Sequence, residues 1–163
     1  MNYTTRLLWL TALVLALYTQ ALYAQAPGLQ QGNPTATSQE LERRDQPVTE
    51  DDARILARAD ELLSDPSVWN RADDRECADD ESNGRRSLFC ALHRACIDVL
   101  GVYDHRRVAL QEVRFAVEDA TRGQDFEHRL RDFNNLPSTQ FTDIKAVLRV
   151  AAERVRQRLG NPE

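Results

Sequence analysis

After about residue 48, apolar side chains recur at helical spacing, and no segment shows the strict alternation of polar and apolar residues that marks a strand. The last segment, residues 141–159, is the clearest, because Gly160 and Pro162 follow it as stop signals. Its apolar positions are Phe141, Ile144, Val147, Leu148, Ala151, Val155 and Leu159. This spacing predicts one long amphipathic helix at the end of the chain.

Four further segments carry the same periodicity. They are the segment that follows Thr49 and residues 87–100, 104–121 and 126–133. The Thr49 hydroxyl can cap the first of these helices, and Gly101 ends the second. Antiparallel helices around a common core are the expected packing. The sequence therefore predicts an all-α fold, in which residues 48–160 form a single small domain of about four to five helices.

The N-terminus has the order of a secretory signal peptide. Arg6 supplies a positive charge, residues 7–17 are a nearly continuous apolar run, and small residues follow. Cleavage is placed after Ala24, with Ala26 as the alternative. The apolar run is shorter than the ~20 residues that a membrane span needs, so no stable membrane anchor is expected after cleavage. Residues 1–24 are accordingly predicted to be the signal peptide.

Residues 25–47 are predicted to be a flexible leader, because they hold few large apolar groups and three prolines. The whole chain has 21 basic and 26 acidic residues and a formal net charge of −5. An acidic exported chain is a poor candidate for nucleic-acid binding, since phosphate binding needs a basic face. Only one basic residue, Lys145, is a lysine, a bias typical of GC-rich bacterial genomes. The expected location is the periplasm or the medium.

The loop between the first two helices, residues 65–86, lacks periodicity, and a loop of that length needs an anchor. Trp69 is one candidate, through packing on the core, and Cys77 is the other. Cys96 lies on the apolar face of the second helix, whereas Cys90 lies about 240° away around that helix. A disulfide between Cys77 and Cys90 is the favoured pairing in an oxidising compartment, with Cys77 and Cys96 as the alternative.

A free Cys90 would suit another class of protein, a thiol-dependent hydrolase with His105 or His128 as the base. Asn134 or Asn135 would then orient the imidazole. All of these residue types are present, but none of the spacings is diagnostic. No catalytic residue is assigned on this basis, and the hydrolase stays the alternative function.

Metal binding has little support in the sequence. The three histidines do not show the paired spacing that zinc sites use. The acidic segment from Asp79 matches the first positions of a calcium loop, but Cys90 stands where that loop needs a bidentate glutamate. No metal and no cofactor is expected.

The helix predicted at residues 104–121 has a markedly polar face that includes His105, Arg107 and Gln111. Arg114 and Glu118 are neighbours at i, i+4 spacing on the same helix, and such pairs usually lie in solvent and contribute little. Arginine forks also recognise carboxylates well, so this face is a candidate binding surface.

Three short motifs stand out in the chain. They are the tryptophan loop SVWN with Trp69 and Asn70, the helix start CALHRA from Cys90, and the phrase NNLPSTQF before the last helix. Together they resemble a bacterial family of small helical domains of unknown function, over about residues 52–156. The chain differs from the family in having a signal peptide, and His93 where glycine is expected. The resemblance implies the helical fold and no chemistry, because the family has no assigned activity.

The phrase FNNLPSTQF is interpreted as structural. Its asparagines suit turns, Pro137 fixes the chain, and Ser138 or Thr139 can cap the last helix, with a ligand site as the alternative. The leading hypothesis is an exported, non-enzymatic helical domain that binds an unknown protein or small ligand. The candidate binding residues are Trp69, Asn70, His93, His105, Arg107, Gln111, Asn134 and Asn135.

Overall fold

The computed structural model describes residues 47–77, 82, 84–122 and 124–161, so the predicted signal peptide and nearly all of the leader lie outside the described residues. Within this part of the chain there are five α-helices, one 3-10 turn and no strand. The helices are α3 (Glu50–Leu62), α5 (Leu88–Leu100), α6 (Val108–Ala120), α7 (Arg129–Asn135) and α8 (Phe141–Gly160), and the turn is η1 (Pro66–Val68). The all-α prediction is confirmed.

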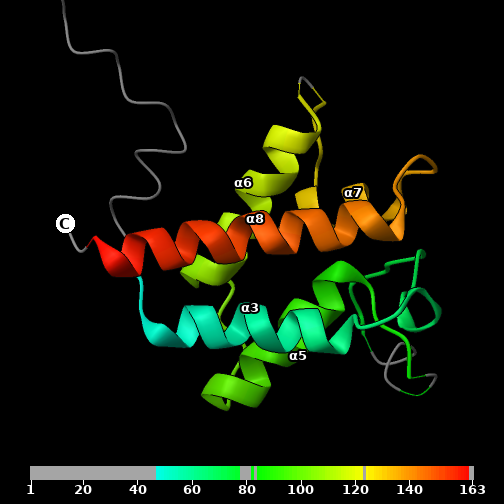
Figure 1. The fold of residues 1–163 in the computed structure, drawn as a ribbon. Helices are drawn as coiled ribbons and strands as arrows, with labels where there is room; N and C mark the ends of the chain where they lie inside the picture. The colour runs from blue at the N-terminus through cyan, green and yellow to red at the C-terminus, as the bar shows by residue number, and fades with distance from the viewer. Residues whose placement is uncertain (1–46, 78–81, 83, 123, 162–163) are drawn as a thin grey trace, which may run out of the picture. The chain divides into compact units, whose positions relative to one another are not determined.

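Helices α3 and α8 lie side by side and run in opposite directions (Figure 1). Helix α5 crosses α3, and helix α6 crosses α8. The apolar stripes that the sequence predicted meet between these helices: Ile55, Leu92, Val113 and Leu148 are almost completely buried. Burial of each such side chain contributes about 1.5–3 kcal/mol. None of the helices in the described residues is both long and apolar enough to cross a membrane.

Local hydrogen bonds set the ends of α3 and α5 where the sequence predicted them. Thr49 N donates to Asp52 Oδ2 at 2.9 Å, which closes the first turn of α3. Ser87 Oγ accepts from Cys90 N at 3.1 Å and caps α5. Gly101 ends α5 with a φ of 78°, a left-handed conformation that glycine adopts without strain.

The starts of α6 and α7 are later than predicted. The Asp104 carboxylate accepts a hydrogen bond from Arg106 N at 2.9 Å and closes a separate turn, so α6 begins at Val108. In the same way Asp132 Oδ2 accepts from His128 N at 2.8 Å, and α7 begins after His128 instead of at residue 126. In both cases an aspartate side chain accepts from a nearby backbone N–H group, and the helix begins later than predicted.

The cap of α8 also differs from the prediction. Gln140 is the N-cap residue, and its backbone N donates to Asp143 Oδ2 at 2.8 Å. Thr139, expected as a cap, is buried and donates its hydroxyl to Phe133 O at 2.7 Å. The phrase before α8 is therefore folded back onto α7.

Both predicted anchors hold the long loop between α3 and α5. Trp69 is buried in the core, with its ring centre 6.0 Å from that of Phe141. Cys77 and Cys90 form a disulfide with Cα atoms 5.4 Å apart, and Cys96 is a buried thiol. This is the pairing that the helical geometry favoured.

Candidate functional site

The motif residues around Trp69 meet in one hydrogen-bonded network, which we call the loop anchor (Trp69, Asn70, Asn134 and Asn135). Asn134 is completely buried, and its Oδ1 accepts hydrogen bonds from Trp69 Nε1 at 2.8 Å and from Leu88 N at 3.0 Å. Its Nδ2 donates to Asn70 O at 2.9 Å and to Asn135 Oδ1 at 3.1 Å. A single amide group therefore joins the loop, the start of α5 and the end of α7.

Asn135 carries the network further along the loop. Its Oδ1 accepts from Asp73 N at 2.8 Å, and its Nδ2 donates to Asp73 O at 2.9 Å. Arg71 Nη2 adds bonds to the carbonyl oxygens of Pro137 and Thr139, at 3.1 and 3.0 Å. The polar groups of the phrase thus hold the loop in place, which supports the structural interpretation of FNNLPSTQF.

Arg107, another candidate binding residue, is directed into the domain. Its Nη2 donates to Asp52 Oδ2 at 2.8 Å and its Nε to Asp52 Oδ1 at 3.2 Å. The fully buried Asp52 also accepts from Ala109 N at 3.0 Å. These bonds tie the start of α6 to the start of α3, so the guanidinium is used in packing the helices.

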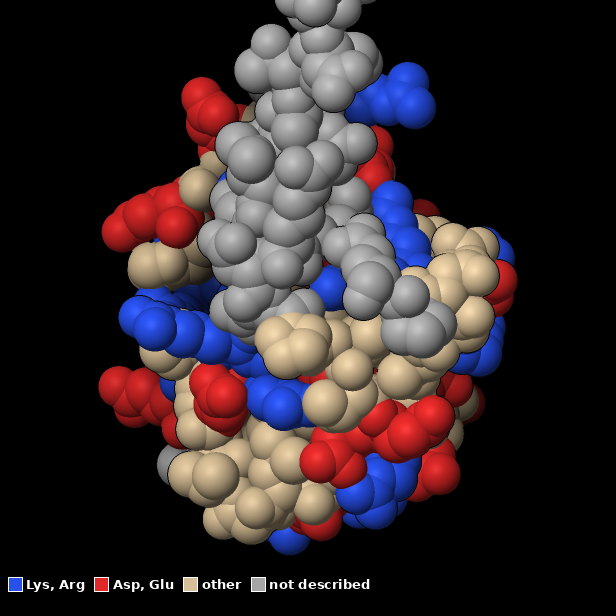
Figure 2. All heavy atoms as spheres, turned by 90° about the vertical axis from the view of Figure 1, so that its left-hand side faces the viewer, with Lys and Arg blue, Asp and Glu red and all other residues tan. Residues whose placement is uncertain are grey.

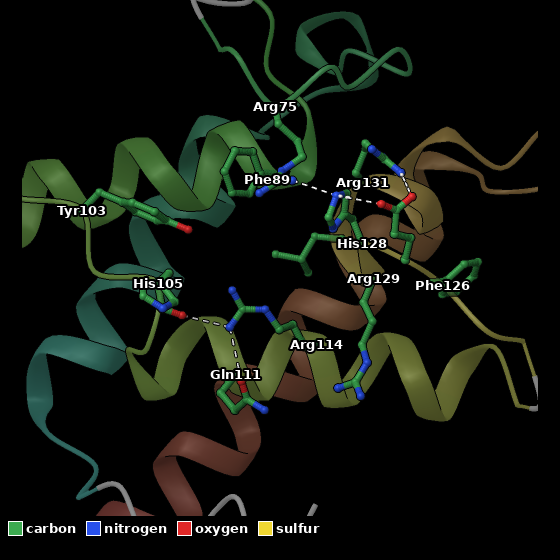
Figure 3. A pocket seen from close by; sticks show the side chains of 12 residues that line it. Arg75, Phe89, Tyr103, His105, Gln111, Arg114, Phe126, His128, Arg129 and Arg131 are labelled. Carbon is green, nitrogen blue, oxygen red and sulfur yellow. Dashed lines mark hydrogen bonds and ion pairs between the residues drawn. The ribbon is translucent and has the colours of Figure 1, made fainter.

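Two of the remaining candidate binding residues, His105 and Gln111, lie at a cleft of about 640 Å³ between α5, α6 and α7 (Figure 3). We call it the arginine cleft. The basic and imidazole side chains of the lining are Arg75, Arg114, Arg129, Arg131, His105 and His128.

Two of the four arginines have carboxylate partners at the rim. Arg129 Nη1 lies 3.2 Å from Glu118 Oε2, and Arg131 Nη2 lies 2.6 Å from Asp132 Oδ1. Glu118, expected beside Arg114 at i, i+4 spacing, thus contacts Arg129 near the start of α7. Arg75 and Arg114 reach the same cleft from the long loop and from α6.

Arg75 is held over the cleft by an imidazole and an aromatic ring. Its Nη1 donates to His128 Nε2 at 2.9 Å, and its guanidinium carbon lies 5.6 Å from the centre of the Phe89 ring. His128 Nε2 also lies 3.7 Å from Glu127 Oε1, so the imidazole stands between Arg75 and a carboxylate. The ion pairs among the described residues do not include Arg75.

The backbone at Arg75 has an uncommon conformation. Arg75 and Cys77 have φ angles of 70° and 64°, in the left-handed region that residues with a side chain rarely adopt. Arg75 N donates to Asp73 Oδ1 at 2.8 Å, and Asp73 is in turn bonded by Asn135. The loop anchor on one side and the disulfide on the other hold this turn, and so position Arg75.

Arg114 comes from α6 and points towards the middle of the cleft (Figure 3). Its Nη1 donates to His105 O at 3.0 Å and to Gln111 Oε1 at 3.2 Å. These two bonds help to orient the guanidinium in the cleft. The predicted candidates His105 and Gln111 therefore act on the cleft partly by positioning Arg114.

An aromatic cluster of Phe89, His93 and Tyr103 lies beside the cleft. The Tyr103 ring centre is 4.5 Å from that of His93 and 6.1 Å from that of Phe89. His93, predicted as a binding residue, packs on Tyr103, and the cleft itself is lined by the other two rings. Burial raises the pKa of Tyr103, and the positive charges of Arg114 and Arg75 oppose this rise.

Charges outside the cleft are mixed. On the face shown in Figure 2, basic side chains lie among acidic ones wherever described residues are visible. Asp98, for example, accepts from Arg58 Nε and from Arg94 Nε, each at 2.8 Å. The cleft also has an acidic lining residue, Glu127, whose Oε2 lies 3.7 Å from Arg131 Nη2.

The described cysteines offer no nucleophile. Cys90 is a disulfide sulfur and is 2% exposed. Burial raises the pKa of the Cys96 thiol to about 11. A nucleophilic cysteine needs access to substrate and a lowered pKa, so the alternative of a hydrolase using Cys90 lacks its thiolate in this structure.

The described residues contain no group of three or more side chains placed to hold a metal ion. Most of the acidic segment that was compared with a calcium loop lies outside them.

Residues 47–154 match a family of unknown function, DUF6197. The chain belongs to the DUF6197 family. The family resemblance seen in the sequence is confirmed. No match was found among curated proteins or among solved structures. The matched region of this chain contains both the loop anchor and the arginine cleft.

The sequence analysis missed Arg75, Phe89 and Tyr103 as lining residues of this DUF6197 domain. One signal for Arg75 was present: it lies two residues before Cys77, and a disulfide at Cys77 also fixes the backbone of its neighbours. The two aromatic residues carried no such signal, because their spacing is equally typical of core positions.

Proposed function

We propose that this protein is an exported, non-enzymatic binding domain whose arginine cleft takes a small ligand with a carboxylate or phosphate group. The observation that carries the proposal is that Arg75 and Arg114, from distant parts of the chain, reach the same cleft. Planar guanidinium groups bind carboxylates and phosphates through two parallel hydrogen bonds, more strongly than neutral donors do.

The dimensions of the cleft favour a small molecule over a protein partner. Its volume of about 640 Å³ is within the range of ligand pockets, roughly 300–1,000 Å³. The mixed charges elsewhere on the described surface favour neither a nucleic acid nor a charged protein face.

Export to the periplasm or the medium is part of the proposal. It is supported by the signal-peptide pattern of residues 1–24 and by the disulfide between Cys77 and Cys90, since disulfides persist in oxidising compartments.

The proposal is tested by titrating inorganic phosphate and acetate into the purified native protein, with calorimetry and thermal unfolding as readouts. Bound anions should raise the melting temperature by mass action. Arg114→Gln should lower the affinity about tenfold, because one charge-assisted pair is lost.

Arg122→Gln is the matched control, since Arg122 is exposed and does not line the cleft. If both variants weaken binding equally, the anions respond only to the overall charge and the proposal is wrong. The same conclusion follows if neither anion binds to the native protein.

A further inference from the structure

We infer that the ligand of the arginine cleft is an aromatic acid. Its aromatic body would pack against the exposed rings of the cleft, and Arg75 and Arg114 would hold its anionic group. The inference rests on the proposed function and adds the chemical class of the ligand.

The first observation is that aromatic side chains face the cleft from opposite directions. Phe89 and Tyr103 lie on one side and Phe126 on the other (Figure 3). All three are only partly buried, whereas Phe115 of α6 is completely buried in the core. Large rings left accessible in a concave site are typical of binding surfaces.

The second observation is that the positive charges lie beside these rings. The Arg75 guanidinium carbon is 5.6 Å from the centre of the Phe89 ring. Arg75, Arg114 and Tyr103 all line the same cleft, and the Tyr103 hydroxyl points into it (Figure 3). A ligand whose anionic group is joined directly to an aromatic ring can contact both kinds of group at once.

The third observation is the volume of the cleft. A cleft of about 640 Å³ is much larger than an inorganic anion requires. An inorganic anion would leave the aromatic rings in contact with water, and an uncharged aromatic molecule would itself offer the guanidinium groups no anionic acceptor. An aromatic acid satisfies both parts of the lining.

The test compares three carboxylates that differ only in the body attached to the acid. The probes are 2-naphthoate, its saturated counterpart decalin-2-carboxylate, and acetate, each titrated by calorimetry into the native full-length protein at one ionic strength. Ring stacking should make 2-naphthoate bind about three- to tenfold more tightly than the saturated acid.

Variants of the cleft assign the preference to its rings. Phe126→Leu and Tyr103→Leu should each lower 2-naphthoate affinity several-fold and leave acetate affinity unchanged. Tyr103→Phe, which keeps the ring, should retain the native affinity. Thermal unfolding of each variant shows that it is folded at the temperature of the titration.

The outcomes separate this inference from the proposed function. If acetate binds and Arg114→Gln weakens it, but 2-naphthoate gains nothing over decalin-2-carboxylate, the cleft binds anions and the aromatic preference is wrong. If none of the three acids binds, or Arg114→Gln leaves all three unchanged, the proposed function and the inference both fail.

Discussion

The loop anchor and the arginine cleft both include residues of the long loop between α3 and α5, and both are rich in polar side chains, but they use those side chains in opposite ways. In the anchor, Asn134 is completely buried and its amide oxygen and nitrogen each bond to the protein. In the cleft, His128 holds Arg75, His105 and Gln111 hold Arg114, and both arginines line an open space. A buried polar group must be satisfied from within the fold, whereas an oriented charge in a cleft can serve a ligand.

The two regions are also mechanically linked. Asn135 holds the Asp73 peptide group, and Asp73 Oδ1 in turn accepts from Arg75 N. The disulfide at Cys77 fixes the other side of the same turn. This link runs through Asn135, whereas Asn134 bonds Trp69 and the start of α5. Variants at Asn134 should change mainly stability, and variants of the cleft mainly binding.

The largest effect is expected from breaking the disulfide. Its cysteines are 13 positions apart, and releasing a loop of this size lowers the free energy of unfolding by about 3 kcal/mol in the chain-entropy model. Cys77→Ser should therefore lower the melting temperature markedly, and should also weaken anion binding because Arg75 is no longer positioned. Dithiothreitol should destabilise the native protein and leave the variant almost unchanged.

Thiol titration provides the control for this prediction. The native protein should show one thiol, Cys96, which reacts only after unfolding because it is buried and its pKa is raised to about 11. A second thiol that reacts in the folded protein would contradict the disulfide.

The next effect is expected in the anchor. Asn134→Ala leaves Trp69 Nε1 and Leu88 N buried without their acceptor, which should lower the free energy of unfolding by about 2–3 kcal/mol in urea unfolding. The exposed Asn161, changed to alanine, is the control and should alter stability by less than about 0.5 kcal/mol.

Anion titration of the same variant sharpens the comparison. At a temperature where Asn134→Ala is folded, it should bind phosphate and 2-naphthoate nearly as well as the native protein. A loss of binding without a loss of stability would place Asn134 in the ligand site and break the distinction between anchor and cleft.

Variants of the cleft should show the reverse, with a large loss of affinity and little loss of stability. Arg75→Gln should lower the affinity for 2-naphthoate about tenfold, or about 1.4 kcal/mol, while the stability changes by less than about 0.5 kcal/mol. The small effect on stability is expected because Arg75 is exposed. Calorimetry measures the affinity and urea unfolding the stability of the same preparation. A large loss of stability would show that Arg75 is mainly structural.

The smallest effect is expected at Asp98, which belongs to neither region. Hydrogen bonds from Arg58, together with the charge of Arg94, lower the pKa of Asp98. Because the pKa is lower in the folded protein, the carboxylate stabilises the fold above its unfolded pKa of about 3.9, and this contribution is lost as the pH falls through the lowered value. Asp98→Asn should cost about 0.2–1 kcal/mol at pH 7, as partly exposed ion pairs do.

Urea unfolding between pH 2 and pH 7 measures this dependence. The native protein and Asp98→Asn should converge in stability at the acid end and have the same affinity for 2-naphthoate at pH 7. A difference in stability that persists unchanged at pH 2 would mean that the negative charge of Asp98 is not the cause.

The sequence by itself determined the helices, because their apolar spacing and end signals are local properties. It also identified both anchors of the loop: Trp69 is the large apolar residue in an otherwise polar segment, and helical geometry separates Cys90 from the core-facing Cys96. The starts of α6 and α7 and the cap of α8 were misplaced, because Asp104, Asp132 and Asp143 side chains bond nearby backbone N–H groups. Asn134 and Asn135, expected in a turn, are instead the last two residues of α7.

Only the tertiary structure decided what the polar candidates do. Arg107 and Arg114 lie two turns apart on one polar face, and no pattern in the sequence distinguishes them. The crossing of α3 and α6 brings Arg107 onto the buried Asp52, 55 positions away, while Arg114 faces the cleft. Likewise the amide of Asn134 bonds Trp69 across 65 positions. Whether a polar group serves the fold or a ligand depends on which distant segments pack around it, and this is set by the packing of the whole core.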